Sequence, residues 1–544
     1  CLMMSSIFEN SILSFVISAV VLAVINASHK AALYLSSNSF FASLCNFISF
    51  GWRFDAASKG IVSSSDTMFF LMTAVLFIAI CITISLFKAG KQYKCNTKRS
   101  IFYIFVIIVL LFCNFERYGF NGDLSKNKTY SVSKYTKNML SECNDTVKIT
   151  YYKSKSLENL YPEVRSVESY LQTYAKCNTN IIYKSINTDK NEDARNLLND
   201  YGIYPQRIRT VNSNSTEYLS VFSCIIIEAG GRIESIPFVM SSQSLEYDLD
   251  TRILSEVFGV QNRVNIIMGN GMSLTEDYSY LVQWLESQGF YITLVEPEDL
   301  YENDIDGALL VIGESEIDYA ESAMIEEYIK AKKGEVLFTV NPYSTDIETD
   351  WKITQNENNY ISSLLGNYGI FFRPSIVSDL SCSRITMYSD DSAKNAEVIN
   401  YPLWISLLPQ ENTNLGVNLY WAVPLTITSD AKPYLLTSNY AWETNLDFEV
   451  PEKLIETNPF YVKDMSGKKD NSGTFIVAAK SDEGVYVISD QYFLNSLING
   501  SSGGEKGDYR NFMFVTNLLL KMNGQNELAA LQNKTIANTS LYKR

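Results

Sequence analysis

Two apolar runs separated by a basic loop decide the organisation of this chain: MFFLMTAVLFIAICITISLF (Met68–Phe87) and IFYIFVIIVLLFCNF (Ile101–Phe115). The first run is uncharged and has the length that a helix needs to cross the core of a bilayer. The second run is shorter, and Tyr118 and Phe120 extend it into the interface as an aromatic anchor. The sequence therefore predicts two neighbouring membrane-spanning helices, at 68–87 and 101–120.

The loop between these runs, residues 88–99, is basic and contains no acidic residue. Its basic side chains belong to Lys88, Lys91, Lys94, Lys98 and Arg99. Short loops rich in Lys and Arg stay on the cytoplasmic side of a membrane. We therefore expect these five residues to set the topology and everything after Gly119 to lie outside the cytosol.

A further apolar stretch near the N-terminus, ILSFVISAVVLAVIN, predicts a third span at about residues 11–28. Given the cytoplasmic loop, this helix runs outward. Residues 36–66 then form an external connection rich in aromatic side chains, a composition more typical of an interfacial amphipathic helix than of a binding loop. The expected location is a bacterial cytoplasmic membrane, with membrane lipid around the spans and the large C-terminal part extracytoplasmic.

The charge and the histidine content exclude several classes of function. The chain has 544 residues and a net charge of −15, of which the part up to Phe120 contributes +5 and the remainder −20. An acidic exterior argues against nucleic acid as a partner, because nucleic acid requires a basic patch. The chain has one histidine, His29, so the catalytic mechanisms and metal sites that depend on histidine lack their usual residue in the exterior part. We expect no metal, no cofactor and no catalytic residue.

Residues 121–262 have the element order of a thioredoxin-like α/β domain. Strands at 147–153 and 179–187 alternate with helices at 160–175 and 193–202, and a hairpin turning on Gly230-Gly231 follows. Pro205 would occupy the cis-proline position of that fold. No CxxC follows the first strand, which excludes thiol–disulfide chemistry. Cys143 and Cys177 each precede a predicted strand, and an oxidising compartment would permit a disulfide between them.

Residues 263–525 predict a doubly wound α/β domain, followed by a polar tail at 526–544. VNIIMGNG (264–271), GALLVIGES (307–315) and EVLFTVNP (335–342) are continuous apolar strands, which is typical of a parallel sheet covered on both faces. Gly269, Asn270 and Gly271 stand at a strand-to-helix turn, where backbone N–H groups can hold an anion. A simple tight turn is the alternative interpretation. The chain contains no GxxxxGK[ST] and therefore no ATPase site of that type.

Two other patterns suggest chemistry but lack essential residues. Asp390 and Asp391, with Asp379 and Ser389, could hold a hard metal ion, but the spacing is not that of a calcium loop, and a solvated loop is the simpler interpretation. A doubly wound fold also invites comparison with class I glutamine amidotransferases. EVLFTVNPYS has no cysteine and no histidine follows it, so that reaction has no nucleophile or base.

Several stretches together resemble one transport family. NLLNDYGIYPQRI, IIIEAGGRIESIPFV, VNIIMGNG, GEVLFTVNP and KPYLLTSNYAWE are similar to the extracytoplasmic auxiliary component of gliding-motility-type ABC transporters. The resemblance covers residues 101–544 and implies a transmembrane anchor, a thioredoxin-like domain and an amidotransferase-like domain. The family commonly has Gly-His-Gly-Glu where this chain has Gly269-Asn270-Gly271-Met272. The family also usually ends in a membrane helix, whereas this sequence stops at Arg544 after a polar tail, so that either the segment was cut or the anchor is absent.

The first hundred residues resemble a different protein. SSIFENSILSFVISAVVLAVI and FISFGWRFDAASKGIVSSSDTMFFLMTAVLFIAI look like the last two helices of an ABC-2-type permease. The resemblance implies a non-enzymatic permease fused to its auxiliary subunit, which works with a separate ABC ATPase subunit and the remaining permease helices on an unknown transported substrate. A membrane-anchored hydrolase that uses carboxylates and a ligand-free scaffold are the alternative hypotheses.

Overall fold

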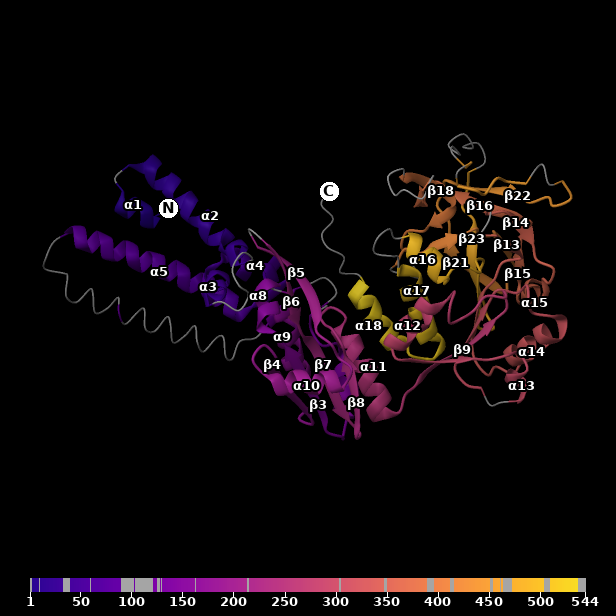
Figure 1. Cartoon of the computed structure of the whole chain (residues 1–544), viewed down its shortest axis with the longest axis horizontal. Coiled ribbons are helices and arrows are strands. Elements are labelled where there is room, and N and C mark those ends of the chain that lie inside the picture. Colours follow the sequence, from indigo (N-terminus) through magenta and orange to yellow (C-terminus); the bar gives the residue numbers. More distant parts are fainter. Residues whose placement is uncertain are drawn as a thin grey trace. The chain divides into compact units, whose positions relative to one another are not determined.

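A computed structural model describes most of the chain (Figure 1). The described residues are 2–8, 10–32, 40–58, 60–89, 102, 121–124, 128, 130–161, 163–212, 215–302, 305–346, 350–388, 396–410, 415–450, 454–459, 461–462, 472–502 and 509–536. The chain divides into two compact units, Cys1–Phe258 and Gly259–Arg544, which are called here the first unit and the second unit.

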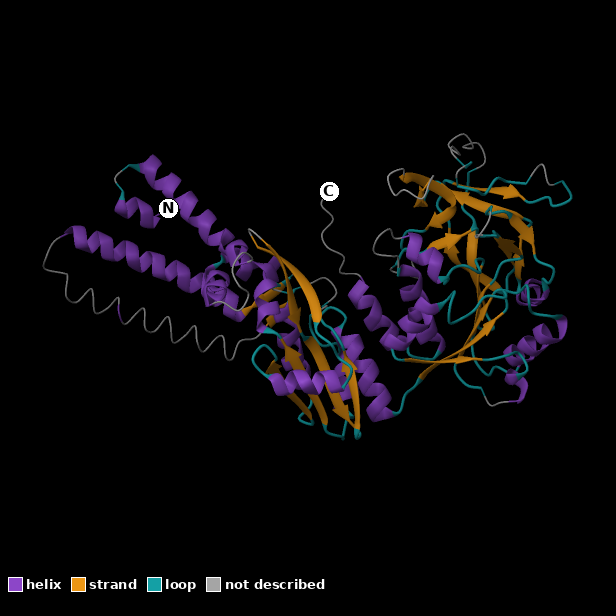
Figure 2. Cartoon of the chain, viewed as in Figure 1, coloured by secondary structure: helices purple, strands orange, loops and turns teal. Residues whose placement is uncertain are grey.

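The first unit begins with helices and continues as an α/β domain (Figure 2). Its elements are α1 (Leu2–Ile7), α2 (Ser11–Ala32), α3 (Phe40–Ile48), α4 (Phe50–Ser58), β1 (Ile61–Ser63), α5 (Ser64–Ala89), β2 (Asn121–Asp123), α7 (Lys134–Ser141), β3 (Val147–Lys153), α8 (Lys155–Leu160), α9 (Val164–Ala175), β4 (Ile181–Asn187), α10 (Glu192–Asp200), β5 (Gln206–Asn212), β6 (Ser215–Val221), β7 (Ser223–Ala229), β8 (Arg232–Ile236) and α11 (Leu245–Phe258).

Two helices of the first unit, α2 and α5, are long and apolar enough to cross a membrane. The apolar segments are Ser11–Ala31 and Ser64–Ser85, and in each only 11% of the most apolar stretch is buried within the protein. Such a surface requires lipid or other helices around it, because exposed apolar area of this extent is unfavourable in water. These helices coincide with the spans predicted at 11–28 and 68–87. The predicted span at 101–120 and the basic loop lie almost entirely outside the described residues.

A short ribbon of two strands joins the residues before α5 to the residues before the α/β domain. β1 immediately precedes α5 and pairs antiparallel with β2, with Ile61 opposite Asp123 and Ser63 opposite Asn121. The amide of Leu124 also donates to the carbonyl of Gly60 (2.8 Å). Residues 121–123 therefore lie beside residues 61–63, which directly precede α5.

A four-stranded sheet with the order β4-β3-β7-β8 forms the centre of the first α/β domain. β3 is parallel to β4 and antiparallel to β7, and β7 is antiparallel to β8. Ala229 pairs with Arg232, so Gly230 and Gly231 are the two turn residues, and both have positive φ as a type I′ turn requires. The predicted hairpin is confirmed. α10 packs on one face of the sheet through Ala194 and Leu198.

The cis-proline prediction for Pro205 is wrong. The described residues contain no cis peptide bond. Pro205 precedes β5, which pairs only with β6 in a separate two-stranded ribbon. The strand that pairs with β3 is instead β7, which begins at Ser223. The predicted position therefore belongs to an insertion outside the main sheet.

The predicted disulfide is also absent, because Cys143 and Cys177 are both free thiols. Each thiol donates to a carbonyl of its own segment, Cys143 to Asp145 (3.4 Å) and Cys177 to Thr173 (3.6 Å). The side chain of Asn178 bonds the carbonyl of Cys143 (3.0 Å) and so joins the two segments without a covalent link. Burial raises the pKa of both thiols, which keeps them in the unreactive protonated form.

The second unit is a mixed α/β domain. Its elements are β9 (Asn262–Met268), α12 (Ser279–Ser287), β10 (Phe290–Leu294), α13 (Asp299–Glu302), β11 (Ala308–Ile312), α14 (Tyr319–Lys330), β12 (Val336–Thr339), β13 (Tyr343–Thr345), β14 (Ile353–Gln355), α15 (Tyr360–Leu365), η2 (Gly366–Tyr368), β15 (Ile370–Phe372), β16 (Ser375–Asp379), β17 (Cys382–Tyr388), β18 (Ala396–Ser406), β19 (Asn418–Tyr420), β20 (Leu425–Ile427), β21 (Ala431–Leu436), β22 (Ala441–Asn445), β23 (Ile476–Ser481), β24 (Val485–Ile488), α16 (Ser496–Ser502), α17 (Arg510–Met522) and α18 (Asn526–Ile536).

Its large sheet follows the order β10-β9-β11-β12-β24-β23-β20-β15, and the strands from β10 to β24 are parallel. Figure 1 shows α14 and α15 on one side of this sheet and α12 and α17 on the other. Strands covered on both faces must be apolar throughout, and all five residues of β11 are buried. The parallel arrangement predicted from the apolar strands is confirmed.

The polar tail predicted at 526–544 begins too early. Residues 526–536 form α18, and Leu528, Ala529 and Leu531 on this helix are buried. Asn517 on α17 donates to the carbonyl of Ala529 (2.7 Å). Three apolar side chains within one helical stretch supply the buried stripe that holds α18 in place, although the segment as a whole is polar in composition.

We expect Gly313→Ala to destabilise the second unit more than Gly524→Ala does. Both glycines have positive φ (74° and 75°), so alanine costs both positions similar backbone strain. A Cβ at Gly313 would lie 2.3 Å from the Cβ of Asn270, whereas a Cβ at Gly524 meets no atom within 4 Å. The added overlap should lower the free energy of unfolding by a further ~1–3 kcal/mol. Five of the six tryptophans lie in the second unit, so denaturation followed by tryptophan fluorescence measures it. Equal losses in the two variants would contradict this packing.

Candidate functional site: a polar joint at the end of strand β3

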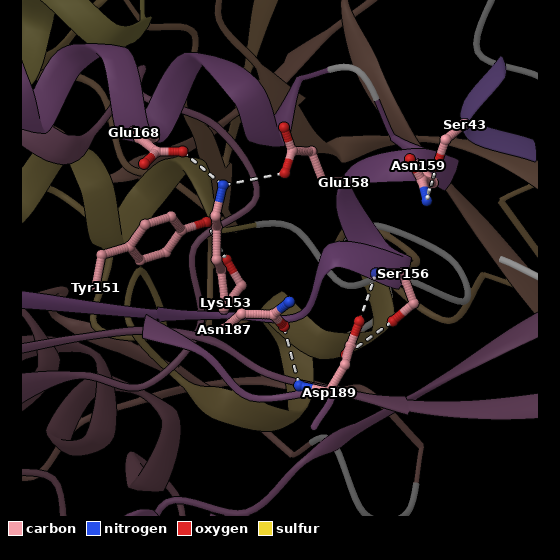
Figure 3. A network of polar contacts seen from close by, with 10 residues as sticks. Ser43, Tyr151, Lys153, Ser156, Glu158, Asn159, Glu168, Asn187 and Asp189 are labelled. Atoms are coloured by element: carbon pink, nitrogen blue, oxygen red, sulfur yellow. Dashed lines mark hydrogen bonds and ion pairs between the residues drawn. The ribbon is translucent and has the colours of Figure 1, made fainter. Parts of the chain in front are cut away.

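The carboxyl end of β3 carries a lysine held between two glutamates. The Nζ of Lys153 lies 3.0 Å from the Oε2 of Glu158 on α8 and 2.5 Å from the Oε2 of Glu168 on α9. Figure 3 shows the lysine side chain between these two carboxylates. Lys153 is the last residue of its strand, so its position relative to both helices is set by the sheet. The three side chains therefore tie α8 and α9 to the central strand.

The charge state of Lys153 follows from this arrangement. Burial opposes the charged form, but Glu158 and Glu168 outweigh it and raise the pKa of the Lys153 ammonium. A lysine that acts as a nucleophile must instead lose its proton near neutral pH. The geometry is that of an ion cluster that fixes α8 and α9, and it does not suit covalent catalysis.

The start of α8 is fixed by Asp189, which follows β4. The amide and hydroxyl of Ser156 donate to the two oxygens of the Asp189 carboxylate (3.0 and 3.2 Å), and the amide of Asp189 donates to Asn187 (3.0 Å). A carboxylate at the first turn of a helix satisfies free N–H groups and complements the helix dipole. Figure 3 shows this contact beside the lysine cluster. The first turn of α8 is thus closed by the neighbouring strand.

A break between α8 and α9 creates a corner, named here the α8–α9 corner and comprising residues 155–175. Tyr161 has extended dihedral angles (φ −125°, ψ 105°) because the next residue in the sequence is Pro162, which disfavours helix at the residue before it. Sequence periodicity predicted one helix over 160–175, and α8 was missed. Its signal was local: Ser154 and Ser156 are residue types that favour helix starts.

The α8–α9 corner contacts the connection between α2 and α5. The Nδ2 of Asn46 on α3 donates to the carbonyl of Asn159 (2.8 Å), and the Nδ2 of Asn159 donates to the hydroxyl of Ser43 (3.4 Å). The partners in each bond are more than one hundred residues apart in the chain. Figure 3 shows Asn159 and Ser43 next to the Lys153 cluster.

Asp66, in the first turn of α5, joins the same elements through charge. Its Oδ1 lies 2.9 Å from the Nη1 of Arg53 on α4 and 3.8 Å from the Nη2 of Arg165 on α9. The side chains of Asp66 and Arg53 are only 9% and 5% exposed, so this pair is largely removed from water. The Arg53 guanidinium also lies over the rings of Phe47 and Phe69, 5.3 and 5.1 Å from their centroids. We call the contacts of Ser43, Asn46, Arg53 and Asp66 with the α8–α9 corner the polar joint.

The structure places the predicted Gly269-Asn270-Gly271 loop at the carboxyl end of β9, next to the end of β11. The Asn270 side chain donates to the hydroxyl of Tyr278 (3.0 Å) and accepts from the amide of Met272 (3.2 Å). The amide of Gly269 donates to the carbonyl of Ile312 (2.8 Å). A Cβ at Gly269 would lie 2.6 Å from Ile317 Cδ1, so the loop is tightly packed.

These contacts favour the tight-turn interpretation of the loop. The helix that follows, α12, begins only at Ser279, and the amide of Tyr280 in its first turn donates to the hydroxyl of Ser496 (2.9 Å). A ligand-contacting role for the loop stays a prediction.

Glu314 follows the neighbouring strand β11 and is fully buried. Its two oxygens accept from the amide and hydroxyl of Ser362 (2.7 and 2.5 Å), at the start of α15. Burial raises the pKa of Glu314 to about 7, although the bonds from Ser362 oppose this effect. The carboxyl group is engaged in holding α15 against the sheet.

Several predicted site residues lie outside the described residues: Ser389, Asp390, Asp391, Lys91, Lys94, Lys98, Arg99 and the side chain of Lys88. Asp379 is described and buried, and its carboxylate accepts from Ser381 and Ser438, as a structural residue does. Among the described residues, no group of three or more His, Cys, Asp and Glu side chains could hold a metal ion.

The polar joint was not predicted from the sequence. Arg53 and Asp66 were a usable signal, because charges within an aromatic-rich connection next to a membrane span are costly unless they are paired. The partner Arg165 had no signal, since nothing local relates it to Asp66.

We expect Lys153→Met to loosen β3 and α9, because it leaves Glu158 and Glu168 facing each other in a partly buried site. Local opening measured by amide hydrogen exchange should become easier by ~1–3 kcal/mol. Lys148→Met is the matched control, since the Lys148–Glu228 pair is about half exposed and should change stability by less than ~1 kcal/mol. The Lys153 pKa is raised, so its contribution is fully present at neutral pH and is lost only in the alkaline range, above about pH 10. Equal effects of both substitutions would contradict the role given to Lys153.

We expect the second unit to lose stability as the pH rises from about 4.5 to about 7, through the range in which Glu314 must ionise while buried. The folded pKa lies above the unfolded value, so the folded state binds more protons in this range and the free energy of unfolding falls with pH, by about 3 kcal/mol in total. Glu314→Gln imitates the protonated group and should remove the Glu314 share of this slope, measured by denaturation with tryptophan fluorescence at several pH values. The buried Asp490 adds a slope of the same sign, which this substitution leaves in place. An unchanged slope would show that other groups cause it.

Comparisons with known proteins give two family matches. Residues 261–517 match a family described as an ABC-type uncharacterized transport system, and residues 126–228 match a domain of unknown function. An uncharacterized protein of Borreliella burgdorferi is 27% identical over 382 residues, which is 64% of this chain and 73% of that protein. A solved mmIFT52 N-terminal domain is 12% identical, with a TM-score of 0.29 over 48% of this chain and 98% of that chain. The first match supports an auxiliary component of an ABC-type transport system.

Proposed function

We propose that this chain is a non-enzymatic membrane subunit of an ABC-type transport system, in which a permease-like N-terminal portion is joined to an extracytoplasmic auxiliary portion. The observation that carries the proposal is the match of residues 261–517 to the transport family. The two long apolar helices ahead of the α/β units support a membrane location. A separate cytoplasmic ATPase subunit would power the system, because the sequence has no phosphate-binding motif of the P-loop type.

The β1–β2 pairing supports the proposed topology. β1 lies directly before α5 and β2 follows residue 120, and the two strands are side by side. If α5 crosses the membrane once, the chain must cross it a second time before β2 in order to return. The apolar run at 101–115 has the composition for this second crossing, and the basic loop at 88–99 would lie in the cytosol. The α/β units and residues 40–63 would then share the outer side.

The domain architecture supports an auxiliary portion of the gliding-motility type. The order β4-β3-β7-β8, with one parallel and two antiparallel pairings, is the one expected for a thioredoxin-like domain. The parallel strands of the second unit suit a doubly wound, amidotransferase-like domain. At the end of β3, where a redox motif would stand, the chain has Lys153 and Ser154 instead of cysteines. These domains would bind the transported substrate or an extracytoplasmic partner.

Purification of the tagged full chain from its native membrane in mild detergent tests the proposal. We expect an ABC ATPase subunit to co-purify and to be identified by mass spectrometry. A tagged, unrelated protein with two membrane spans, prepared from the same cells, controls for contamination. A stable and homogeneous preparation of the chain without any ATPase subunit would contradict the proposed function.

A further inference from the structure

The polar joint is an interface between two parts of the first unit that are distant in the sequence. Residues 40–66 contain α3, α4, β1 and the first turn of α5, whereas the α8–α9 corner belongs to a domain that begins after residue 120. The hydrogen bonds of Asn159 connect residues 113 and 116 positions apart in the chain. The β1–β2 pairing brings residues 61–63 beside residues 121–123, and the contacts of the polar joint depend in addition on the complementarity of the two surfaces.

The charges of the polar joint are complementary in a specific way. Arg165 stands in the first turn of α9, where the helix dipole disfavours a cation, and Asp66 stands in the first turn of α5, where the dipole favours an anion. Bringing Asp66 to Arg165 compensates the unfavourable position of the arginine. Arg53 takes the other side of the same carboxylate and is itself held by Phe47 and Phe69. The surface formed by residues 40–66 thus presents the largely buried carboxylate of Asp66, which Arg53 neutralises from one side and Arg165 of the α/β domain contacts from the other.

The α8–α9 corner is itself attached to the central sheet through side chains of Lys153 on β3 and Asp189 after β4. Lys153 fixes Glu158 on α8 and Glu168 on α9, and Asp189 closes the first turn of α8. Asn159 and Arg165 are therefore presented from a corner that is attached at several points to the sheet. A surface that is ordered before contact loses less conformational entropy when it binds.

We propose that the α8–α9 corner is a docking surface for residues 40–66, and that this docking holds the first α/β domain on the outer end of the membrane helices independently of the covalent connection through residues 90–120. The inference rests on the proposed function only in that it names the docked segment as part of a permease. In a transport system that has the two portions as separate chains, the same surface would be the interface between permease and auxiliary subunit.

Cleavage of the full chain tests this docking. A recognition sequence for a site-specific protease is inserted after Tyr93, which keeps all five basic residues of the loop. The chain carries a C-terminal affinity tag, is purified intact in mild detergent, is bound to the affinity resin and is then cut. We expect the N-terminal piece to stay bound to the tagged piece through washing. Separation of the two pieces in the unsubstituted chain would overturn the proposal.

Substitutions show whether the polar joint is responsible. Arg165→Glu places a second carboxylate against Asp66 and should accelerate loss of the N-terminal piece at least ~10-fold, the equivalent of ~1.4 kcal/mol. Arg195→Glu, on the exposed surface of α10, makes the same change in net charge and should have no effect. Equal retention with Arg165→Glu and Arg195→Glu would overturn the proposal.

A second substitution separates a lost contact from a misfolded domain. Asp66→Asn should weaken retention in the otherwise unchanged chain, because it leaves Arg53 and Arg165 without their shared carboxylate. In the Arg165→Glu background it should instead restore part of the retention, because it removes the repulsion and lets Arg53 face Glu at position 165. Additive weakening by the two substitutions would overturn the proposal. No ATPase subunit is needed for this experiment, so its result and that of the co-purification are independent.

Discussion

The first unit depends on one buried carboxylate. Asp66 has 9% of its side chain exposed and lies between Arg53 and Arg165, which come from two other helices. A buried charge without a partner costs several kcal/mol, and the opposite charges of Arg53 (2.9 Å) and Arg165 (3.8 Å) therefore favour the meeting of α4, α5 and α9 at this point. The pairing of β1 with β2 adds a second constraint, because it brings the start of α5 and the start of the α/β domain together. The N-terminal helices and the first α/β domain are consequently parts of one unit.

The second unit uses its buried charges to position backbone segments. Glu314 holds the start of α15, and Asp490, fully buried after β24, accepts from the amides of Tyr420 and Tyr492 (both 2.7 Å). Burial raises the pKa of Asp490 well above its ordinary value, while its backbone hydrogen bonds oppose that effect. These groups lie at the carboxyl ends of parallel strands, the edge where α/β enzymes place reactive groups. Here each one is engaged with the chain itself, Glu314 with Ser362 and Asp490 with the amides of Tyr420 and Tyr492.

The features predicted correctly from the sequence are those with a local signal. The apolar runs predicted α2 and α5, and the Gly230-Gly231 pair predicted the β7–β8 hairpin. The continuous apolar segments predicted the parallel strands of the large sheet. The errors arise where distant segments decide the outcome. Pro205 precedes a ribbon that is inserted into the domain. The segments that carry Cys143 and Cys177 are joined by the Asn178 side chain, which donates to the carbonyl of Cys143, and both thiols are free. The polar joint links residues about one hundred positions apart, and one sequence contains no information about that pairing.

The central claim is a topology. The α/β units and residues 40–63 lie on one side of the membrane, and residues 88–99 lie on the other. It is tested most directly by adding a site-specific protease to membranes that contain the chain with a cleavage sequence after Tyr93. The topology predicts cleavage in inside-out vesicles and protection in intact spheroplasts. Cleavage in intact spheroplasts would contradict it, because the basic loop would then lie on the same side as the α/β units.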